Sequence, residues 1–434
     1  NGNPNLTPDG AREWDATIAP NRDDFFGGDL QGIIDHLDYL KDLGITGLYL
    51  CPIFEATTNH KYDTTDYFEI DRHFGDKEVF ANLVEEAHKR GIKIMLDAVF
   101  NHIGYQSGQW QDVLKDGEKS PYKDWFHIQE FPVTEDKLKS PRELPYHTFA
   151  FASYMPKLNT ANPEVRDYLL SVATYWIENF DIDAWRLDVA NEIDHQFWRD
   201  FRKAVLAKKP DLYILGEIWH TSQPWLQGDE FHAVMNYPLS ESIKDYFLRQ
   251  RKKTEQFISE INSQSMYYKQ QISEVMFNLL DSHDTERILT TAKGNVQHVK
   301  AALTFLYLQK GTPCIYYGTE LALIGGPDPD CRRVMPWNRV SEDNDMLNFM
   351  KKLIKVRKDV ASIIQHGNYR LEEVKPDVLS LKWNYQGKEV QAIFNQSSEK
   401  YTLDRDSVDL ASHCQFEDGQ QVILPDGFII TVSK

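Results

Sequence analysis

The sequence predicts an α/β protein: a (β/α)8 TIM barrel with an inserted subdomain after strand 3 and a C-terminal antiparallel β-sandwich domain. Three observations lead to this fold class. Apolar strand-like runs alternate with helix-like stretches along most of the 434 residues, one long polar stretch interrupts the alternation, and short alternating strands replace it after about residue 360. A doubly wound open sheet is the alternative fold, but eight strand-helix units are many for it.

The barrel strands are expected wherever a short apolar run follows a helical pattern. An amphipathic stretch over residues 30–43 precedes the run Gly-Ile-Thr-Gly-Leu-Tyr-Leu-Cys-Pro at 44–52, and a second helical pattern covers 77–90. Apolar runs of this kind are typical of parallel strands that are buried on both faces. Eight strands are predicted, at residues 44–52, 68–70, 92–100, 183–189, 213–218, 231–235, 275–280 and 313–317.

Two changes of pattern define the domain boundaries. The stretch 102–159 is polar, aromatic and proline-bearing without a clean helical period, and we predict that it forms an inserted subdomain B. Loops at the carboxyl face of a barrel build its active site, so this insertion is expected to wall a substrate cleft. The catalytic barrel then comprises residues 1–101 and 160–359. Short runs bounded by Gly, Asn and Asp turns predict a C-terminal β-domain over 360–434, with strands at 378–383 and 390–394.

Composition excludes several classes of partner. The net charge is -18 and the pI is near 5.2, which argues against nucleic acid and anionic membranes. The sequence has no apolar run of membrane-spanning length and no signal peptide at its start. The cysteines have neither metal nor disulfide spacing, and Cys51 and Cys314 lie in apolar runs where we expect reduced core residues. These features favour a cytoplasmic enzyme. The sequence opens in the loop Asn-Gly-Asn-Pro-Asn, so we expect that an upstream segment has been removed.

The stretch Asp-Ala-Trp-Arg-Leu-Asp-Val-Ala-Asn-Glu at 183–192 organises the predicted site. Arg186 and Asp188 alternate with apolar residues, so the period of two puts both charged side chains on one face of a strand. One reading is a structural ion pair, in which each member satisfies the other. The other is an ionised carboxylate that an arginine holds ready to act as a nucleophile. The rest of the chain decides between them.

Polar clusters end four of the predicted strands, and the carboxyl ends of barrel strands lie on one face. Acidic and imidazole groups from four separate strand ends are hard to bring together by chance, which favours the catalytic reading. The clusters are Asp97-Ala98-Val99-Phe100-Asn101-His102, Arg186 with Asp188, Glu217-Ile218-Trp219-His220, and Asp281-Ser282-His283-Asp284.

These four clusters resemble, in order and in spacing, the four signature regions of the α-amylase family of glycoside hydrolases, and the resemblance extends over essentially the whole chain. Three further stretches resemble the neopullulanase, cyclomaltodextrinase and maltogenic amylase subgroup. They are Asn59-His60-Lys61-Tyr62-Asp63, Met155-Pro156-Lys157-Leu158-Asn159 and Gly325-Gly326-Pro327-Asp328-Pro329-Asp330-Cys331-Arg332.

By this resemblance, Asp188 is the nucleophile, Glu217 the acid/base, and Asp284 the third carboxylate, which steadies the oxocarbenium-like state. A retaining mechanism needs one carboxylate to form a glycosyl-enzyme and another to deliver and then remove a proton. Arg186 is expected to hold Asp188 charged. Two ionised neighbours then leave Glu217 protonated for the first step.

The resemblance also implies which residues bind the sugar that is cleaved. His102 and His283 would donate hydrogen bonds to its hydroxyls, and Tyr62 would stack on its ring. Asp328 and Arg332 would hold the next sugar toward the non-reducing end.

Two residues after the fifth strand are expected on the acceptor side of the cleft. They are Trp219 and His220. For Trp219, plain packing in the core is an equally weighted alternative.

The sequence departs from the subgroup in two respects. The subgroup usually carries an N-terminal β-domain that pairs two subunits and narrows the cleft, and this sequence contains none, which leaves the oligomeric state open. Relatives also fold their opening loop around calcium. Here Leu6 and Thr7 stand where acidic or amide side chains are expected, and calcium prefers several anionic oxygens. We expect that no cofactor is required and that calcium binds weakly at best, with the candidate ligands Asn1, Asn3, Asn5, Gly27 and Asp29.

The function predicted from the sequence is a retaining α-glucan hydrolase. It would cleave α-1,4 links in maltooligosaccharides, cyclodextrins or pullulan, with some transglycosylation. An α-1,6-preferring oligoglucosidase is one alternative. A non-catalytic scaffold of amylase-like fold is another, but a scaffold has no reason to keep an expensive charged cluster.

Overall fold

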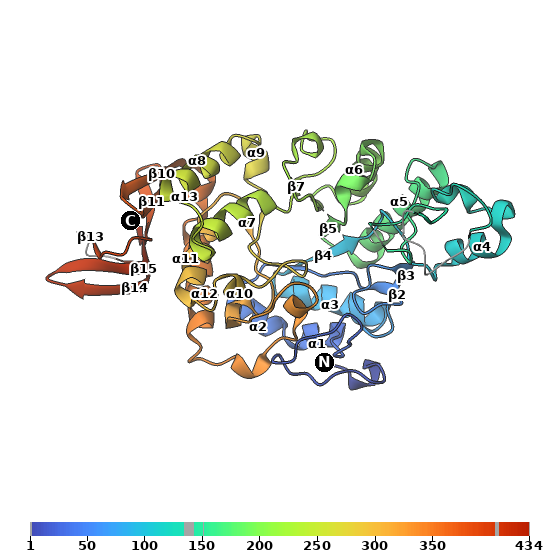
Figure 1. Cartoon of the computed structure of the whole chain (residues 1–434), viewed down its shortest axis with the longest axis horizontal. Coiled ribbons are helices and arrows are strands. Elements are labelled where there is room, and N and C mark those ends of the chain that lie inside the picture. The colour runs from blue at the N-terminus through green and yellow to red at the C-terminus, as the bar shows by residue number, and fades with distance from the viewer. Residues whose placement is uncertain (1, 134–142, 151, 404–407, 434) are drawn as a thin grey trace. The chain divides into compact units, whose positions relative to one another are not determined.

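The structure is a computed structural model that describes residues 2–133, 143–150, 152–403 and 408–433 (Figure 1). The chain divides into two compact units. The first consists of Asn1–Trp14, Arg22–Ile218 and Pro224–Val234, and the second of Asp15–Asn21, Trp219–Gln223 and Met235–Lys434.

A parallel sheet of five strands forms the centre of the first unit, in the order β1-β4-β5-β6-β7. Every residue of β5 is buried, and Arg186 of that strand lies in register with Asp97 of β4. This sheet contains five parallel strands of the eight-stranded barrel that the alternating pattern predicts. The strands are β1 (Gly47–Tyr49), β4 (Lys93–Ala98), β5 (Ala184–Leu187), β6 (Tyr213–Gly216) and β7 (Ala233–Val234).

The helices of the first unit begin at side-chain caps. Asp76, Asn162 and Asp194 each accept a backbone N–H in the first turn of α3, α5 and α6, as residues with short polar side chains do at helix starts. The helix expected over 30–43 is divided at His36, whose ring bonds the Gly32 carbonyl and so competes with the helical pattern. The helices are α1 (Leu30–Asp35), α2 (Leu37–Leu43), α3 (Lys77–Lys89), α4 (Gly108–Asp116), α5 (Pro163–Phe180) and α6 (His195–Lys208).

The structure corrects the prediction for residues 68–70. They belong to β3 (Thr64–Ile70), which pairs antiparallel with β2 (Phe54–Ala56) in a separate two-stranded sheet. The alternating polar residues of β3 suit this half-buried hairpin better than a barrel strand. Among the described residues β1 pairs only with β4. Cys51, two residues after β1 and expected in the core, is exposed.

The described part of the predicted subdomain B is held by isolated bridges and an aromatic centre. The bridges include His102 with Lys157 and Phe126 with Leu158. The buried ring of Trp110, from α4, lies 4.7 Å from both the Phe126 and Tyr146 rings. The boundaries 102–159 remain a prediction, as do the barrel limits 1–101 and 160–359.

The second unit contains the parallel pair β8 (Phe277–Asn278) and β9 (Thr312–Pro313), and a series of helices. The helix α11 is almost entirely buried, which suits its apolar sequence. The helices are α7 (Tyr237–Ile243), α8 (Thr254–Ser265), α9 (Gln270–Ser273), α10 (Ile288–Thr291), α11 (Val296–Tyr307), α12 (Asp345–Asp359) and α13 (Ala361–His366).

The C-terminal residues form the expected antiparallel β-domain, drawn in orange and red in Figure 1. Its strands join in a six-stranded sheet of order β10-β11-β12-β15-β13, with β14 also paired to β15. The runs predicted at 378–383 and 390–394 lie in β11 and β12. The strands are β10 (Asn368–Lys375), β11 (Val378–Tyr385), β12 (Lys388–Asn395), β13 (Tyr401–Leu403), β14 (Leu410–Glu417) and β15 (Gln420–Val432). In the described part of the chain, no helix is long and apolar enough to cross a bilayer.

Candidate active site

The first unit contains a cluster of three carboxylates around the buried guanidinium of Arg186, which we call the carboxylate cluster (Asp97, Arg186, Asp188, Glu217). The Nη1 atom of Arg186 lies 2.6 Å from Asp188 and 3.0 Å from Asp97. Its Nη2 atom lies 2.9 Å from Glu217. The structure therefore brings together Asp188 and Glu217, the predicted nucleophile and acid/base, on the two terminal nitrogens of one arginine.

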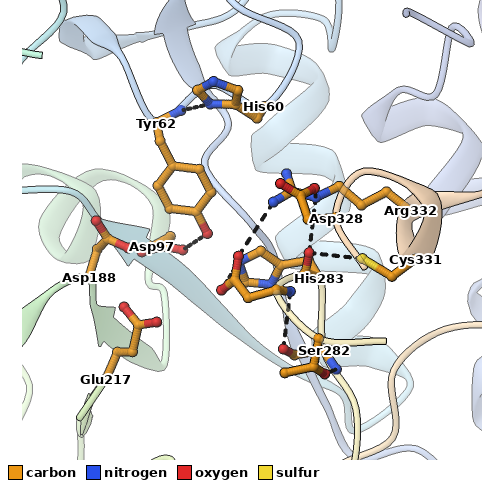
Figure 2. Close-up of polar contacts among 12 residues, drawn as sticks. His60, Tyr62, Asp97, Asp188, Glu217, Ser282, His283, Asp328, Cys331 and Arg332 are labelled. Carbon is orange, nitrogen blue, oxygen red and sulfur yellow. Dashed lines mark hydrogen bonds and ion pairs between the residues drawn. The ribbon is translucent and has the colours of Figure 1, made fainter. Parts of the chain in front are cut away.

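Two tyrosine hydroxyls complete the surroundings of Asp97. Tyr49 donates to its Oδ2 at 2.8 Å. Tyr62 donates to the same atom at 3.0 Å, as Figure 2 shows. With Arg186 on both of its oxygens, Asp97 is a buried carboxylate with four donated hydrogen bonds. This set fixes the ring of Tyr62, which the sequence assigns to stacking on the sugar.

A strained backbone residue holds Glu217. Val189 has φ +47°, a left-handed conformation that a β-branched residue rarely adopts. In this conformation its N–H donates to Glu217 Oε2 at 3.0 Å. Strain at such a position is typical of functional sites, where the surrounding structure maintains a geometry that the local sequence disfavours.

Electrostatics in the carboxylate cluster is set by burial. Burial raises the pKa of Asp188 well above its ordinary value, and the Arg186 guanidinium opposes that effect. The expectation that Arg186 keeps this carboxylate charged therefore describes only the weaker of the two influences. One guanidinium faces three carboxylates, so the cluster favours binding a proton. Burial likewise raises the pKa of the Tyr62 hydroxyl, which stays a donor.

His102 is buried, and its ring stacks on Phe149 with centroids 4.8 Å apart. Burial lowers its pKa to about 3, so the ring is neutral and carries one N–H. The Nε2 atom lies 3.0 Å from the Tyr62 carbonyl, and Nδ1 lies 3.3 Å from the amide nitrogen of Asn101, which is a donor. The proton therefore sits on Nε2 and is donated to Tyr62 rather than held free for a sugar.

The second unit holds a separate set of predicted residues, which we call the arginine loop cluster (His283, Asp284, Asp328, Arg332). Arg332 Nε lies 2.7 Å from Asp328, and its Nη2 donates to Asp284 at 3.4 Å. His283 Nε2 lies 3.0 Å from the other oxygen of Asp284. Figure 2 shows His283, Asp328 and Arg332 close to one another. The structure thus brings together the predicted third carboxylate and the predicted sugar-holding pair.

The structure decides against core packing for Trp219, one of the two readings that the sequence left open. One of its faces is stacked on Tyr237, with centroids 3.7 Å apart and planes 5° from parallel. The side chain is nonetheless 47% exposed, so it is not a core residue. His220 is exposed as well, and its Nδ1 lies 3.0 Å from the Thr221 carbonyl.

The opening segment includes Asp29, the one carboxylate among the predicted calcium ligands. Asp29 Oδ1 accepts N–H groups of Gly2 and Gly32 at 2.9 and 2.6 Å, and Oδ2 accepts that of Asn3 at 2.8 Å. Asn3 in turn accepts the N–H of Asn5. Both oxygens of this carboxylate thus already accept backbone N–H groups.

The other candidate calcium ligands add little to this picture. Gly27 lies nearby in the sequence with φ +76°, and Asn1 lies outside the described residues. Within the described ranges, no group of three or more His, Cys, Asp or Glu side chains is arranged to hold a metal ion.

Sequence reasoning did not assign roles to several residues that build this site. Asp97 was visible as a carboxylate inside the apolar run of strand β4, a signal that a buried charge must have a partner. Tyr49 carries no such signal, because a tyrosine in an apolar strand is ordinary. Val189 contributes through its backbone conformation and Phe149 through packing, and neither can be inferred from residue type.

Comparison with known proteins identifies the family. Residues 5–404 match the family model described as Alpha amylase, catalytic domain. The chain belongs to the α-amylase family. It is 54% identical over 400 residues to an "Intracellular maltogenic amylase" of Bacillus subtilis, covering 92% of this chain and 66% of the relative. A "Cyclomaltodextrinase" of Geobacillus thermopakistaniensis is also 54% identical, over 401 residues, with 92% of this chain and 67% of the relative covered.

A solved structure of this family is similar along the whole chain. It is the "Cyclic alpha-maltosyl-(1-->6)-maltose hydrolase from Arthrobacter globiformis" in complex with its namesake sugar, with TM-score 0.91 and 37% identity over 100% of this chain and 95% of that one. The chain spans about two-thirds of the length of the Bacillus and Geobacillus relatives.

Proposed function

We propose that this α-amylase family chain is a retaining α-glucan hydrolase that cleaves α-1,4 links in maltooligosaccharides, cyclodextrins or pullulan, with some transglycosylation. The observation that carries the proposal is the pairing of Asp188 and Glu217 on one buried arginine, at 2.6 and 2.9 Å. Retaining hydrolysis needs two carboxyl groups held close together, one as nucleophile and one as acid/base. The relatives' names support the substrate class.

In the first step, Glu217 protonates the glycosidic oxygen while Asp188 attacks the anomeric carbon. The bond to the leaving sugar breaks and a covalent glycosyl-enzyme forms. In the second step, the Glu217 carboxylate removes a proton from water, which displaces Asp188 and leaves the product in the α configuration. A sugar hydroxyl in place of water gives transglycosylation.

The surroundings of these two residues support the assignment. The Val189 N–H on Glu217 and the Arg186 guanidinium on Asp188 fix both carboxyl groups before substrate arrives. Such preorganisation is where most catalytic stabilisation comes from. We further propose that Asp284 steadies the positive charge at the anomeric carbon, and that Arg332 and Asp328 hold the neighbouring sugar.

The partner we propose is therefore an α-glucan oligosaccharide. The acidic net charge of -18 argues against nucleic acid and anionic membranes. We propose a cytoplasmic location, which the name of the Bacillus subtilis relative supports. Fractionation of the native host, followed by immunoblotting, tests it.

Product analysis decides between bond specificities. Purified enzyme is incubated separately with pullulan, a cyclodextrin, starch and isomaltose, and products are separated by chromatography. Release of maltose or panose-type products with little attack on isomaltose supports the proposal. Preferential hydrolysis of isomaltose would favour the oligo-1,6-glucosidase alternative. The similarity to a hydrolase whose named sugar contains (1-->6) links is the reason to test it. Asp188→Asn serves as the control for contaminating activity.

The stereochemistry of the first product tests the mechanism. Proton NMR of the anomeric signals in the first minutes of reaction should show the α-anomer ahead of mutarotation. Initial release of the β-anomer would exclude the double displacement.

A further inference from the structure

A buried arginine outside the predicted site joins three segments of the second unit. The Arg287 side chain is completely buried. Its Nε donates to the Cys331 carbonyl at 2.8 Å, and its Nη1 donates to the Tyr317 carbonyl. Its backbone N–H donates to the Gly325 carbonyl at 3.0 Å. One residue therefore ties the loop after β8 to the segment after β9 and to the loop 325–332.

The Arg287 guanidinium packs on aromatic rings in addition to making these hydrogen bonds. Its Cζ lies 3.8 Å from the ring centroid of Tyr316 and 4.7 Å from that of Tyr317. A planar cation that stacks on rings and donates in a fixed fork is a combination that arginine supplies and lysine does not. The Nη2 nitrogen is buried without a hydrogen-bond partner among the described residues, a cost that these contacts must offset.

Cys331 connects Arg287 to the arginine loop cluster. Its carbonyl accepts from Arg287, and its thiol donates to the His283 carbonyl at 3.2 Å. The next residue, Arg332, donates from Nε to the same carbonyl at 3.0 Å and from Nη2 to Asp284. Figure 2 shows Cys331 and Arg332 meeting His283 together. A shift of the Cys331 backbone would therefore move both groups that contact the His283–Asp284 pair.

The loop has little freedom to absorb such a shift. A Cβ atom on Gly325 would lie 2.6 Å from the Asp330 carbonyl oxygen and 2.9 Å from the Cys331 Cα, so the two ends of the loop touch. Asp330 also accepts the N–H of Gly326 at 2.6 Å and pairs with Arg333 at 2.7 Å. The loop is a closed, rigid turn, and Arg287 sets where it sits within the second unit.

We infer that Arg287 is a positioning residue for the reaction: by holding the Cys331 and Tyr317 carbonyls it keeps Arg332 in its working geometry beside Asp284. This inference rests on the proposed function, because it takes Asp284 and Arg332 to be working parts of glycoside hydrolysis. A displacement of about 1 Å in a positioned group can cost on the order of 100-fold in rate.

The first test compares Arg287→Lys with a matched control. Arg370→Lys changes an arginine of the same unit that is 70% exposed and pairs with Glu372. Kinetics with maltotriose are measured well below the thermal midpoint, on enzyme whose folded state is verified by near-ultraviolet circular dichroism. We expect kcat/KM of Arg287→Lys to fall by about 10- to 100-fold and that of the control to stay within about twofold. A lowered thermal midpoint with unchanged kcat/KM would assign Arg287 a purely structural role and overturn the inference.

The second test is a double-mutant cycle with Arg332→Ala. If Arg287 acts by placing Arg332, the double variant should lose little more activity than Arg332→Ala alone, because the placed group is already gone. Losses that multiply would show that the two residues act independently, which overturns the inference. Failure of the proposed function is distinguishable, since it would appear as retained turnover in Asp188→Asn.

A milder change keeps the inference testable if Arg287→Lys does not fold. Cys331→Ala removes only the thiol that donates to the His283 carbonyl. A loss of about threefold to tenfold in kcat/KM is expected, with recovery in Cys331→Ser, because the serine hydroxyl restores the donor. Equal activity of the alanine and serine variants would show that the hydrogen bond from Cys331 to the His283 carbonyl has no part in positioning.

Discussion

The carboxylate cluster of the first unit and the arginine loop cluster of the second differ in how far their charges are exposed to water. The side chains of Arg186 and Asp97 are 0% exposed, while Asp328 in the other cluster is 49% exposed. A charge that is fully removed from water is tolerated only if all of its partners are in place, since removal of one leaves an uncompensated charge. A half-exposed ion pair loses little when one contact weakens.

This difference in exposure determines what each cluster can do. The buried cluster can hold reacting groups in one arrangement, and a change there should be close to all-or-none. The open cluster can contact a hydroxylated ligand and exchange its ion pairs for hydrogen bonds to sugar. Changes there should alter affinity and turnover in graded fashion.

The largest effect is expected at the carboxylate cluster. Asp188→Asn and Glu217→Gln should each reduce kcat by several powers of ten, on the order of 10⁴-fold or more, because each removes an indispensable chemical role. Steady-state kinetics on maltotriose measure the loss, and circular dichroism checks the fold. Asp211→Asn, an exposed position of the same unit, is the control. Retention of more than about a tenth of kcat, equivalent to only about 1.4 kcal/mol, would contradict the assigned roles.

A smaller, graded effect is expected at the arginine loop cluster. Arg332→Ala removes the ion pair with Asp328 and the contact with Asp284. Loss of hydrogen bonds from a charged group should cost about 1.5–3 kcal/mol of transition-state stabilisation, which lowers kcat/KM for maltotriose by about 10- to 150-fold. Initial rates over a range of substrate concentrations give the value. An unchanged kcat/KM would show that this loop does not hold substrate, and the contrast between the clusters would disappear.

The pH dependence of the free energy of unfolding tests the burial of His102 in the first unit, independently of activity. The pKa of His102 is lowered from 6.5 to about 3 by burial, so the unfolded chain binds a proton in this range and the folded chain does not. Its contribution is therefore lost as pH falls from about 6.5 toward about 3, by about 1.4 kcal/mol per pH unit. Between about pH 6 and pH 4, the free energy of unfolding from urea titrations should fall less steeply in His102→Gln, by about 1.4 kcal/mol per pH unit. An unchanged slope in His102→Gln, compared with the original chain, would refute the prediction.

The smallest effect is expected from calcium. Because Asp29 already accepts backbone N–H groups on both oxygens, we expect affinity in the loosest range known, about 10⁻⁴–10⁻³ M. At that affinity, about 1 mM calcium adds at most about 1.4 kcal/mol, so the thermal midpoint should differ by only a few degrees between EDTA and calcium. Activity should survive chelation. A shift of about ten degrees or more, or inactivation by EDTA, would reveal a tight site.

Much of the architecture was predictable because parallel strands and amphipathic helices leave periodic patterns. The runs at 92–100 and 183–189 contain β4 and β5, and the helix at 77–90 contains α3. The strand at 68–70 was misassigned to the barrel. The short stretch Phe68-Glu69-Ile70 carries no information about its partner, and the partner of β3 proved to be the antiparallel β2.

The sequence by itself determined the chemical groups of this protein: which strands end in carboxylates, that Arg186 and Asp188 share a face, and that the family is that of the α-amylases. Only the tertiary structure decided what those groups contact. Three features depend on segments far apart in the chain: the left-handed backbone at Val189, the proton of His102 held by the Tyr62 carbonyl, and the packing of Arg287 against two tyrosine rings. Residue type and spacing encode local periodicity, whereas burial and hydrogen-bond partners arise only when distant segments pack together.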